Sequence, residues 1–234
     1  FNMIRTSLSK GRSTLNIYRN MNADNKRRIR IVKEVQPMMA DRQGFLIVDA
    51  IHSDGQLMPL EEKRYKLEFI GDSITSGEGL AGAKGITEWN CAIFSTLGHY
   101  AVTTADRLDA DYRIISQSGW GVCSSWDNDP GRVLPKYYEQ VCGLLSGKTQ
   151  LEAGAGDKND FTSWQPDAVL VNLGTNDAFA FHSKAWVDEG TGETFEQKLN
   201  PDGSYEAESL ARFEDAVYNF LVVLRRDNPH AHIV

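Results

Sequence analysis

A serine follows a hydrophobic run in the stretch LEFIGDSITSGEG, residues 67–79. A serine hydroxyl can act as the nucleophile in acyl transfer, a reaction that also needs a base for its proton and N–H donors for the oxyanion. The same position suits a helix cap, because the side chain of Ser73 or Thr75 could accept a backbone N–H. Taken alone, Ser73 is therefore undecided between a nucleophile and a structural residue.

Two further polar turns could supply the oxyanion donors. The turn SQSGWG, residues 116–121, contains Gly119 and Gly121, whose backbone N–H groups could approach a substrate because no Cβ is in the way. In GTND, residues 174–177, the side-chain amide of Asn176 could donate, and the Ser73 N–H near a helix N-terminus could be a third donor. Each also has a structural reading, since glycines permit turns and asparagine bonds its own backbone.

Each of these turns follows a predicted strand, and helical patterns lie between the strands. The predicted strands are residues 65–71, 112–116, 167–174 and 231–234, and the predicted helices are 96–108, 132–145 and 205–228. Alternating strands and helices indicate a parallel sheet covered on both faces. Because the carboxyl ends of parallel strands lie at one edge, we expect the three turns to meet there.

The first 62 residues have a different pattern. Short apolar runs alternate with charged residues and are broken by turn signals, which is typical of antiparallel β structure. The basic stretch NKRRIRIVK, residues 25–33, is more simply a strand with a solvated face than a binding patch. The charged stretch LEEKR, after Pro59, reads as a linker. We therefore predict antiparallel β structure at 1–62 and an α/β domain at 63–234.

Composition excludes several classes of function. The net charge of -7 is no basic footprint, so a nucleic-acid partner is not expected. No apolar run reaches the roughly 20 residues that span a bilayer, so no membrane partner is expected. Three cysteines have no metal-like spacing and leave the redox compartment open. We expect no metal and no cofactor, since serine acyl chemistry needs none, and the oligomeric state stays open.

Together, the three blocks resemble the SGNH (GDSL-type) hydrolases, which are esterases and lipases with a flavodoxin-like three-layer fold. The resemblance covers residues 65–234 and is closest to carbohydrate esterase family 2, whose members join a small jelly-roll domain to an SGNH domain and deacetylate xylan and related glycans. It implies that residues 1–62 form a partial N-terminal β-sandwich domain. It also implies that Ser73 is the nucleophile, that Asn176 and Gly121 are oxyanion donors, and that Asp72 holds the nucleophile turn. Ser116 stands where many members have asparagine, which favours Gly121 over Gly119 as the donor.

The general base is the missing part of this constellation. Family members carry it in a late D-x-x-H block, and DNPH, residues 227–230, has that spacing. However, Asp227 ends a predicted helix and Pro229 is a typical stop signal, so this loop should lie at the amino ends of the strands, opposite the site. His182 follows GTND and is a weaker alternative. The chain starts and ends abruptly, and we expect both that it is incomplete at its two ends and that the base lies beyond Val234.

The tryptophans bear on the substrate. Trp120 lies inside the second turn and Trp126 follows it, so either ring could stack on a sugar, although core packing explains Trp120 equally well. Asp72 and Trp120 are thus the residues expected on the substrate side of the site. The resemblance implies a serine esterase for acetylated glycans, and secretion is expected from that substrate class. Two alternatives stay open: a carbohydrate-binding protein with a non-catalytic SGNH cleft, and an SGNH lipase or thioesterase.

Overall fold

The computed structural model describes residues 4–22, 24–38, 41–86 and 88–234. The chain divides into two compact units. One consists of Phe1–Val32 and Ala50–Pro59, and the other of Lys33–Asp49 and Leu60–Val234. The site residues predicted from the sequence all belong to the second, larger unit.

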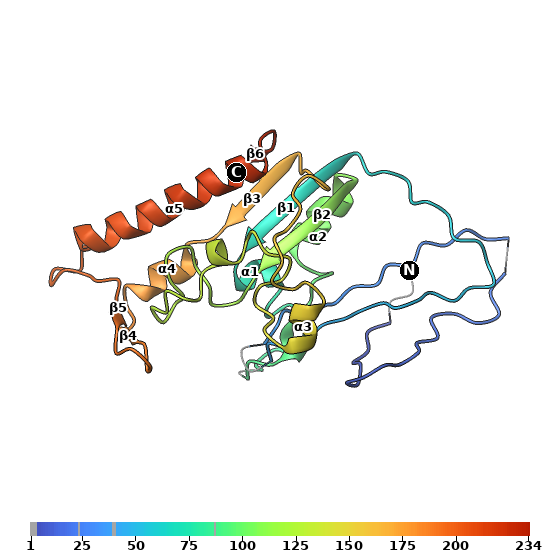
Figure 1. Ribbon diagram of the computed structural model, residues 1–234, viewed down its shortest axis with the longest axis horizontal. Coiled ribbons are helices and arrows are strands. Elements are labelled where there is room, and N and C mark those ends of the chain that lie inside the picture. The colour runs from blue at the N-terminus through green and yellow to red at the C-terminus, as the bar shows by residue number, and fades with distance from the viewer. Residues whose placement is uncertain (1–3, 23, 39–40, 87) are drawn as a thin grey trace. The chain divides into compact units, whose positions relative to one another are not determined.

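A parallel sheet forms the centre of the larger unit (Figure 1). Its strands are β1 (Tyr65–Gly71), β2 (Ala110–Ser116), β3 (Ala168–Asn172) and β6 (His232–Ile233), in the order β2-β1-β3-β6. Every neighbouring pair is parallel. The predicted parallel α/β fold is therefore confirmed, with strands at the predicted places.

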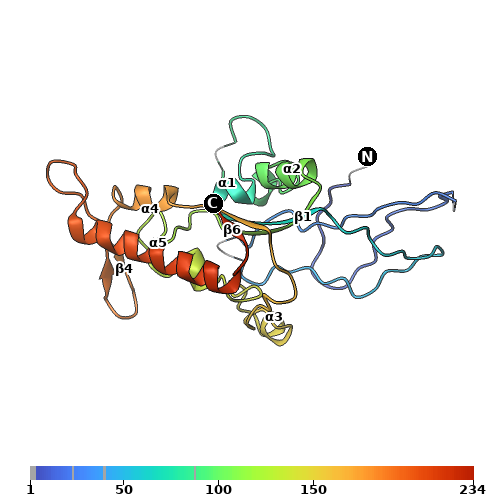
Figure 2. The same cartoon turned by 90° about the horizontal axis from the view of Figure 1, so that it is seen from above.

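Helices cover both faces of this sheet, as Figure 2 shows. On one face, α2 (Tyr100–Arg107) packs against Leu67 and Phe69 of β1. On the other, α5 (Ala207–Asp227) packs against Ile70. Side chains of a strand alternate between its faces, so neighbouring residues of β1 serve the two different layers. The result is the helix–sheet–helix sandwich expected of strands buried on both sides.

The remaining elements are short. They are α1 (Ser73–Ser76), α3 (Lys148–Glu152), α4 (Thr175–Ala180), β4 (Trp186–Val187), β5 (Thr194–Phe195) and the 3₁₀ turns Cys91–Ile93 and Leu134–Lys136. The helix predicted over 132–145 was wrong, since only the second 3₁₀ turn forms there. The N–H groups of Val141 and Cys142 donate to the carbonyls of Asp157 and Ala155 instead of continuing a helix. Tertiary pairing thus overrides the local helical pattern.

A buried polar chain crosses the α5 face of the sheet. Glu68, in the middle of β1, accepts a hydrogen bond from the Tyr138 hydroxyl at 2.8 Å. Asn228, which follows α5, donates to the same hydroxyl at 2.7 Å. Burial raises the pKa of Glu68, while the Tyr138 bond and the Arg113 charge act to lower it. Nothing in the strand pattern around Glu68 indicates that this carboxylate is fully buried.

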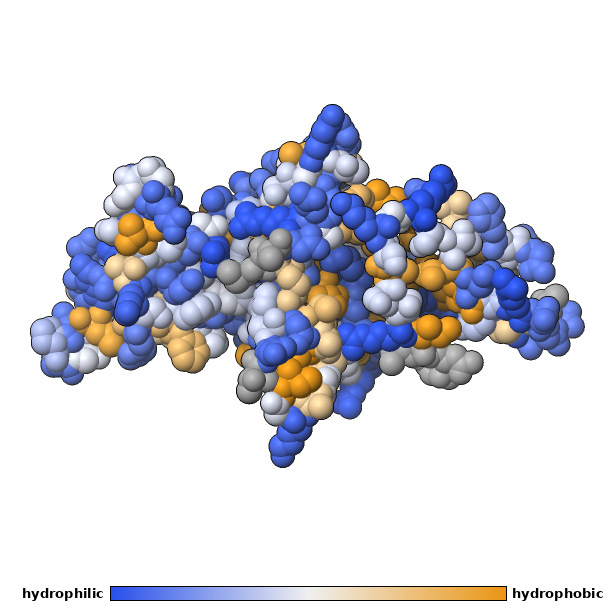
Figure 3. Space-filling view, turned by 90° about the horizontal axis from the view of Figure 1, so that it is seen from below, coloured by the Kyte–Doolittle hydropathy of each residue, from blue (hydrophilic) through white to orange (hydrophobic). Residues whose placement is uncertain are grey.

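In the smaller unit, the described residues form no helix or strand. Their apolar side chains are largely exposed, for example Leu15, Ile29 and Ile51, and the space-filling view colours such side chains orange (Figure 3). The predicted N-terminal antiparallel sheet is thus not found in the described part of 1–62. The antiparallel pair that does occur is β4 with β5, in the larger unit. Among the described residues, no helix is long and apolar enough to cross a membrane.

Residues 33–49 pack with the larger unit, although the sequence pattern groups them with the N-terminal domain. Glu34 accepts a hydrogen bond from the Ser95 hydroxyl at 3.1 Å, and its carbonyl accepts one from Thr96 at 2.7 Å. Arg42 accepts through its carbonyl from the Ser146 N–H. This segment therefore forms part of the surface around the carboxyl edge of the sheet.

Candidate active site

Ser73 is the first residue of α1, and one residue, Asp72, separates it from the end of β1. The helix cap is its neighbour Asp72, whose carboxylate accepts the Ile74 N–H at 3.0 Å. Thr75 is not the cap either, because its hydroxyl pairs with the Tyr100 hydroxyl at 2.8 Å. The half-buried Ser73 hydroxyl has no hydrogen-bond partner among the described residues and is left available for chemistry.

Asn176, in α4, joins the three turns. Its side-chain amide donates to the Trp120 carbonyl at 2.9 Å and to the Asp72 carboxylate at 3.4 Å. The Gln117 N–H donates to the Gly71 carbonyl at 3.2 Å, which ties the second turn to the end of β1. The expectation that the turns after β1, β2 and β3 meet at one edge is therefore confirmed. Asn176 is 8% exposed and lies beside the residue that caps α1.

Gly121 occupies a position that has no room for a side chain. A Cβ there would lie 2.6 Å from Asp177 Cγ, and closer still to the Ser124 carbonyl oxygen. Gly119 differs, because its φ of +79° is a left-handed conformation, and a Cβ there would lie 3.0 Å from Cδ1 of the Trp126 side chain rather than against backbone. The two glycines of the turn thus serve different needs. Neither need decides which N–H would meet a substrate, so the role of Gly121 as donor stays a prediction.

Asp177 is the residue that sequence reasoning underrated. Its carboxylate is buried and accepts the N–H groups of Val122, Cys123 and Ser124 at 2.7–3.1 Å. Three successive N–H groups around one carboxylate form an anion nest. The fourth residue of GTND therefore fixes the backbone just after Gly121, rather than bonding its own turn. In the sequence, only its position next to Asn176 pointed to a role for Asp177 in the site.

The two buried aspartates place two carboxylates close together at this edge, where burial disfavours their charged forms. Burial raises the pKa of Asp72, the bond from the Ile74 N–H opposes that rise, and the charges of Asp177 and Glu78 add to it. Burial also raises the pKa of Asp177, against the three N–H donors that favour its charged form. A further negative charge, such as an oxyanion, therefore needs strong N–H donors in this region.

The two tryptophans of the second turn are placed differently. Trp120 is 5% exposed and packs in the core beside Tyr137, with ring centroids 5.1 Å apart. Trp126 is 52% exposed, and its indole lies beside Gly119. Burial favours the core-packing interpretation of Trp120, whose contact with substrate stays a prediction. Trp126 has the exposed ring face that stacking on a sugar requires.

None of the described histidines makes a hydrogen bond to Ser73, so none is identified as the general base by its contacts. His99, which was expected inside a helix, is the buried cap of α2: its Nδ1 accepts the Ala101 N–H at 3.1 Å, and burial lowers its pKa. His182 is exposed in the turn after α4. His52 belongs to the smaller unit. His232 lies in β6 and pairs with Ala168, at the amino end of β3.

His230 lies in the loop before β6, at the amino edge of the sheet. The level of His232 corresponds to Leu67 in β1, four residues before Gly71. At about 3.3 Å per residue, these levels are ~13 Å apart along the strands. The loops that carry His230 and Ser73 then continue in opposite directions, so DNPH lies on the far side from Ser73, as the helix-end signals indicate.

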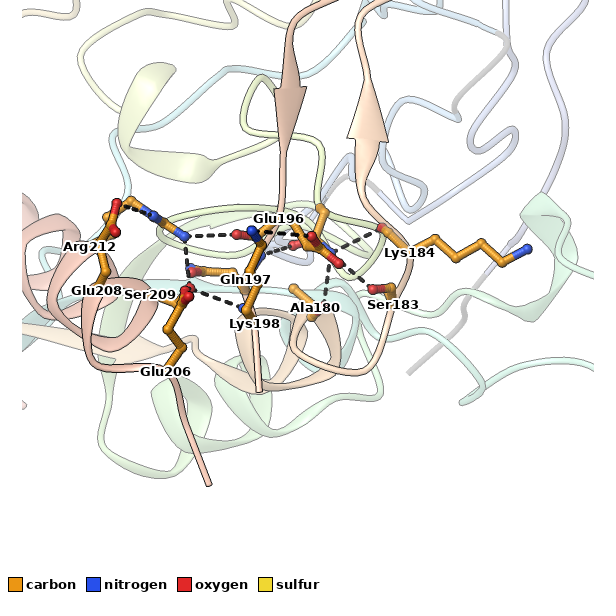
Figure 4. A network of polar contacts seen from close by, with 11 residues as sticks. Ala180, Ser183, Lys184, Glu196, Gln197, Lys198, Glu206, Glu208, Ser209 and Arg212 are labelled. Carbon is orange, nitrogen blue, oxygen red and sulfur yellow. Dashed lines mark hydrogen bonds and ion pairs between the residues drawn. The ribbon is translucent and has the colours of Figure 1, made fainter. Parts of the chain in front are cut away.

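An outer network holds the loops around this edge. Arg212 of α5 donates to the Glu196 carbonyl and to the Ser209 hydroxyl at 2.8 Å each, and Ser209 donates to Glu206 at 2.6 Å (Figure 4). Gln197 donates to the Cys123 thiol at 3.1 Å. Burial raises the pKa of Cys123 to about 11, so this thiol stays protonated at neutral pH and is no nucleophile.

Comparisons with known proteins agree with this geometry. No family model matches the chain. The structure of Est2A, an acetyl xylan esterase from Butyrivibrio proteoclasticus, is 44% identical with a TM-score of 0.75, covering 78% of this chain and 49% of that one. The chain resembles family 2 carbohydrate esterases. A family two carbohydrate esterase from Clostridium thermocellum, solved in complex with cellohexaose, is 26% identical with a TM-score of 0.55, covering 76% of this chain and 44% of that one.

A curated relative gives the same result. Cellulase/esterase CelE of Acetivibrio thermocellus is 28% identical over 175 residues, which cover 75% of this chain and 17% of CelE. The chain thus spans about half, or less, of the length of the proteins it matches. The resemblance inferred from the three sequence blocks is confirmed for the α/β domain.

Proposed function

We propose that this protein is a serine esterase that removes O-acetyl groups from a polysaccharide or oligosaccharide. The observation that carries the proposal is the junction of Asp72, Asn176 and the Trp120 carbonyl, which gathers the three turns beside the uncommitted Ser73 hydroxyl. The similarity to an acetyl xylan esterase at 44% identity supports acetyl groups on a glycan as the substrate class.

In this proposal, Ser73 Oγ attacks the acetyl carbonyl while a general base takes its proton. The N–H groups of Ser73 and Gly121 hold the oxyanion. The Asn176 amide joins them by exchanging its 3.4 Å bond to Asp72 for a bond to the substrate oxygen. The sugar hydroxyl leaves with the proton from the base, and water then hydrolyses the acyl-enzyme and releases acetate. Asp72 holds the nucleophile turn, as its bond to the Ile74 N–H supports. None of the His99, His182, His230 and His232 side chains is assigned as the base.

Two finer points belong to the same proposal. The larger unit adopts the flavodoxin-like SGNH arrangement, which the strand order β2-β1-β3-β6 supports. The N-terminal residues contribute to a β-sandwich, which the period-two alternation around Ile29 and Ile31 supports. Because acetylated plant-type glycans lie outside cells, we also propose that the protein is secreted.

The test uses Ser73→Ala with Ser163→Ala as the matched control. Ser163 is exposed before β3, and its hydroxyl bonds only within its own turn. We expect the full-length protein to release acetate from acetylated xylan, the S73A variant to lose this activity by at least about a thousandfold, and S163A to keep it. Acetate release by S73A at the rate of the unmodified protein would refute the proposed nucleophile.

A second candidate is a glycan-binding protein whose cleft is non-catalytic. The observation that favours it is that no histidine of the larger unit pairs with Ser73 among the described residues. Retention on acetylated xylan without acetate release would support this candidate.

An assay of the 234-residue chain beside a C-terminally extended one would locate the base. Full activity of the shorter chain, lost on His182→Ala or His230→Ala, would identify that histidine as the base. A series of acyl chain lengths would separate an acetyl esterase from a lipase or thioesterase.

A further inference from the structure

The turn that carries Gly121 is held from outside by a residue far away in the sequence. Both the N–H and the hydroxyl of Ser118 donate to the side-chain oxygen of Gln36, at 2.9 and 3.0 Å. Beside them, the Gln117 side chain donates to the Pro37 carbonyl at 3.1 Å. Residues 36 and 37 belong to the 33–49 segment, which is part of the same compact unit. Three hydrogen bonds therefore tie this segment to the apex of the turn.

The bond from Ser118 defines how Gln36 is oriented. A backbone N–H can only donate, so the Gln36 group facing it must be the carbonyl oxygen rather than the NH₂. A flip of the amide would place a donor against a donor. The Gln36 NH₂ is buried and has no partner among the described residues, so it gives no alternative anchor. The contact thus has one productive orientation, and the acceptor oxygen is what the turn requires.

The inner side of the same turn is held by the site itself. Asn176 donates to the Trp120 carbonyl, and the Gln117 N–H donates to Gly71. Between these inner bonds lies the apex, where Gly119 adopts a φ of +79°. The Trp120 N–H closes the apex by donating to the Gln117 carbonyl at 3.3 Å, and the Trp126 N–H donates to the Gly119 carbonyl at 3.1 Å. The N–H and hydroxyl of Ser118 take no part in these bonds, and Gln36 supplies the acceptor that holds this side of the turn.

We propose that Gln36 is a positioning residue for the oxyanion turn. The inference rests on the proposed function, in which the Gly121 N–H stabilises the oxyanion. Oxyanion donors accelerate a reaction only when they are held in place before charge develops. A displacement of about 1 Å at such a site can cost roughly a hundredfold in rate. Gln36 touches no substrate in this proposal and acts only through the Ser118–Gly121 backbone.

The experiment compares three variants of the full-length protein. Gln36→Leu removes the acceptor oxygen. Gln36→Glu keeps an acceptor oxygen on a side chain of the same length. Gln43→Leu is the matched control, with the same glutamine-to-leucine substitution at an exposed position of the same segment. The Gln43 side-chain amide makes no hydrogen bond with the described residues. On a small acetyl ester, we expect kcat of Q36L to fall about ten- to a hundredfold with KM nearly unchanged. Q36E should recover most of this loss, and Q43L should match the unmodified protein.

Amide hydrogen exchange at Ser118 and Gly121 gives a second measurement that needs no activity. We expect faster exchange at both amides in Q36L than in Q43L. A kcat of Q36L within twofold of the unmodified protein would overturn the inference, as would equal losses in Q36L and Q36E or equal exchange rates in Q36L and Q43L. If the unmodified protein releases no acetate, the proposed function fails by itself, and the exchange comparison alone then decides whether Gln36 positions the turn.

Discussion

The two edges of the parallel sheet both carry aspartates in motif-like sequences, but the structure uses them differently. At the carboxyl edge, Asp72 and Asp177 are buried, and their carboxylates accept backbone N–H groups that shape the turns. At the amino edge, Asp227 pairs with the exposed Arg226 and is followed by the exposed His230. The residues that match D-x-x-H literally, 227–230, lie at the amino edge, opposite the candidate site. Strand direction, rather than spacing alone, therefore decides which motif can act.

The largest effect is expected from filling the space beside Gly121. In Gly121→Ala, the new methyl group would overlap the Ser124 carbonyl and the buried Asp177 carboxylate, so backbone must move. We expect a loss of about 3 kcal/mol in the free energy of unfolding and loss of esterase activity. The measurement is denaturant unfolding together with acetate release.

Gly119→Ala is the matched control for this prediction. It strains a residue at φ +79° but meets only the flexible Trp126 side chain, so we expect a cost of about 1–2 kcal/mol. The comparison tests whether Gly121 is required because of its contact with Asp177. Equal losses in the two variants would show that it is not.

A smaller but still large effect is expected for Asp177→Asn. The amide keeps one acceptor oxygen, but its NH₂ would face N–H groups that now point at the carboxylate. Buried donors left without an acceptor cost about 1–3 kcal/mol, and we expect a loss in that range and a lower kcat. Thermal unfolding and kcat of D177N, beside Asp188→Asn at an exposed turn, would check this. An unchanged kcat in D177N would show that the nest does not serve the reaction.

The sequence was informative wherever strand order and turn chemistry decide the outcome. The pattern of β1 gave its bounds, and the three turns after β1, β2 and β3 meet as parallel strands require. It could not give contacts made by residues distant in sequence. The nest around Asp177, the bond from Ser118 to Gln36 and the pairing that replaces the helix at 132–145 all arise only in the folded chain.

Glu68 extends the comparison to a buried carboxylate that accepts from a side-chain hydroxyl, that of Tyr138. Its pKa is raised by burial, so the folded state holds the proton more tightly than the unfolded chain. Stability contributed by the protonated form is then fully present below the usual pKa of about 4.3, and it is lost as pH rises through the folded pKa. Each unit of difference between the two pKa values corresponds to about 1.4 kcal/mol.

Glu68→Gln should therefore flatten this pH dependence. The amide oxygen can still accept from Tyr138, and no charge has to be buried. We expect E68Q to match the unmodified protein near pH 4 and to be at least as stable at pH 7. Urea unfolding at a series of pH values measures this. If E68Q lost as much stability between pH 4 and pH 7 as the unmodified protein does, Glu68 would not be the group whose titration causes the loss.

The smallest effect is expected for His230→Ala, although a motif search would rank it first. His230 is exposed in the loop between α5 and β6, and β6 pairs with the amino end of β3. A base must reach the Ser73 hydroxyl within hydrogen-bond distance, and the sheet itself lies between the two loops. We expect kcat/KM of the full-length protein to change less than about twofold. A hundredfold fall with unchanged thermal stability would place the base at the amino edge. It would also overturn the assignment of the site to the carboxyl edge, because a nucleophile and its base must lie within hydrogen-bond distance of each other and cannot sit at opposite ends of the strands.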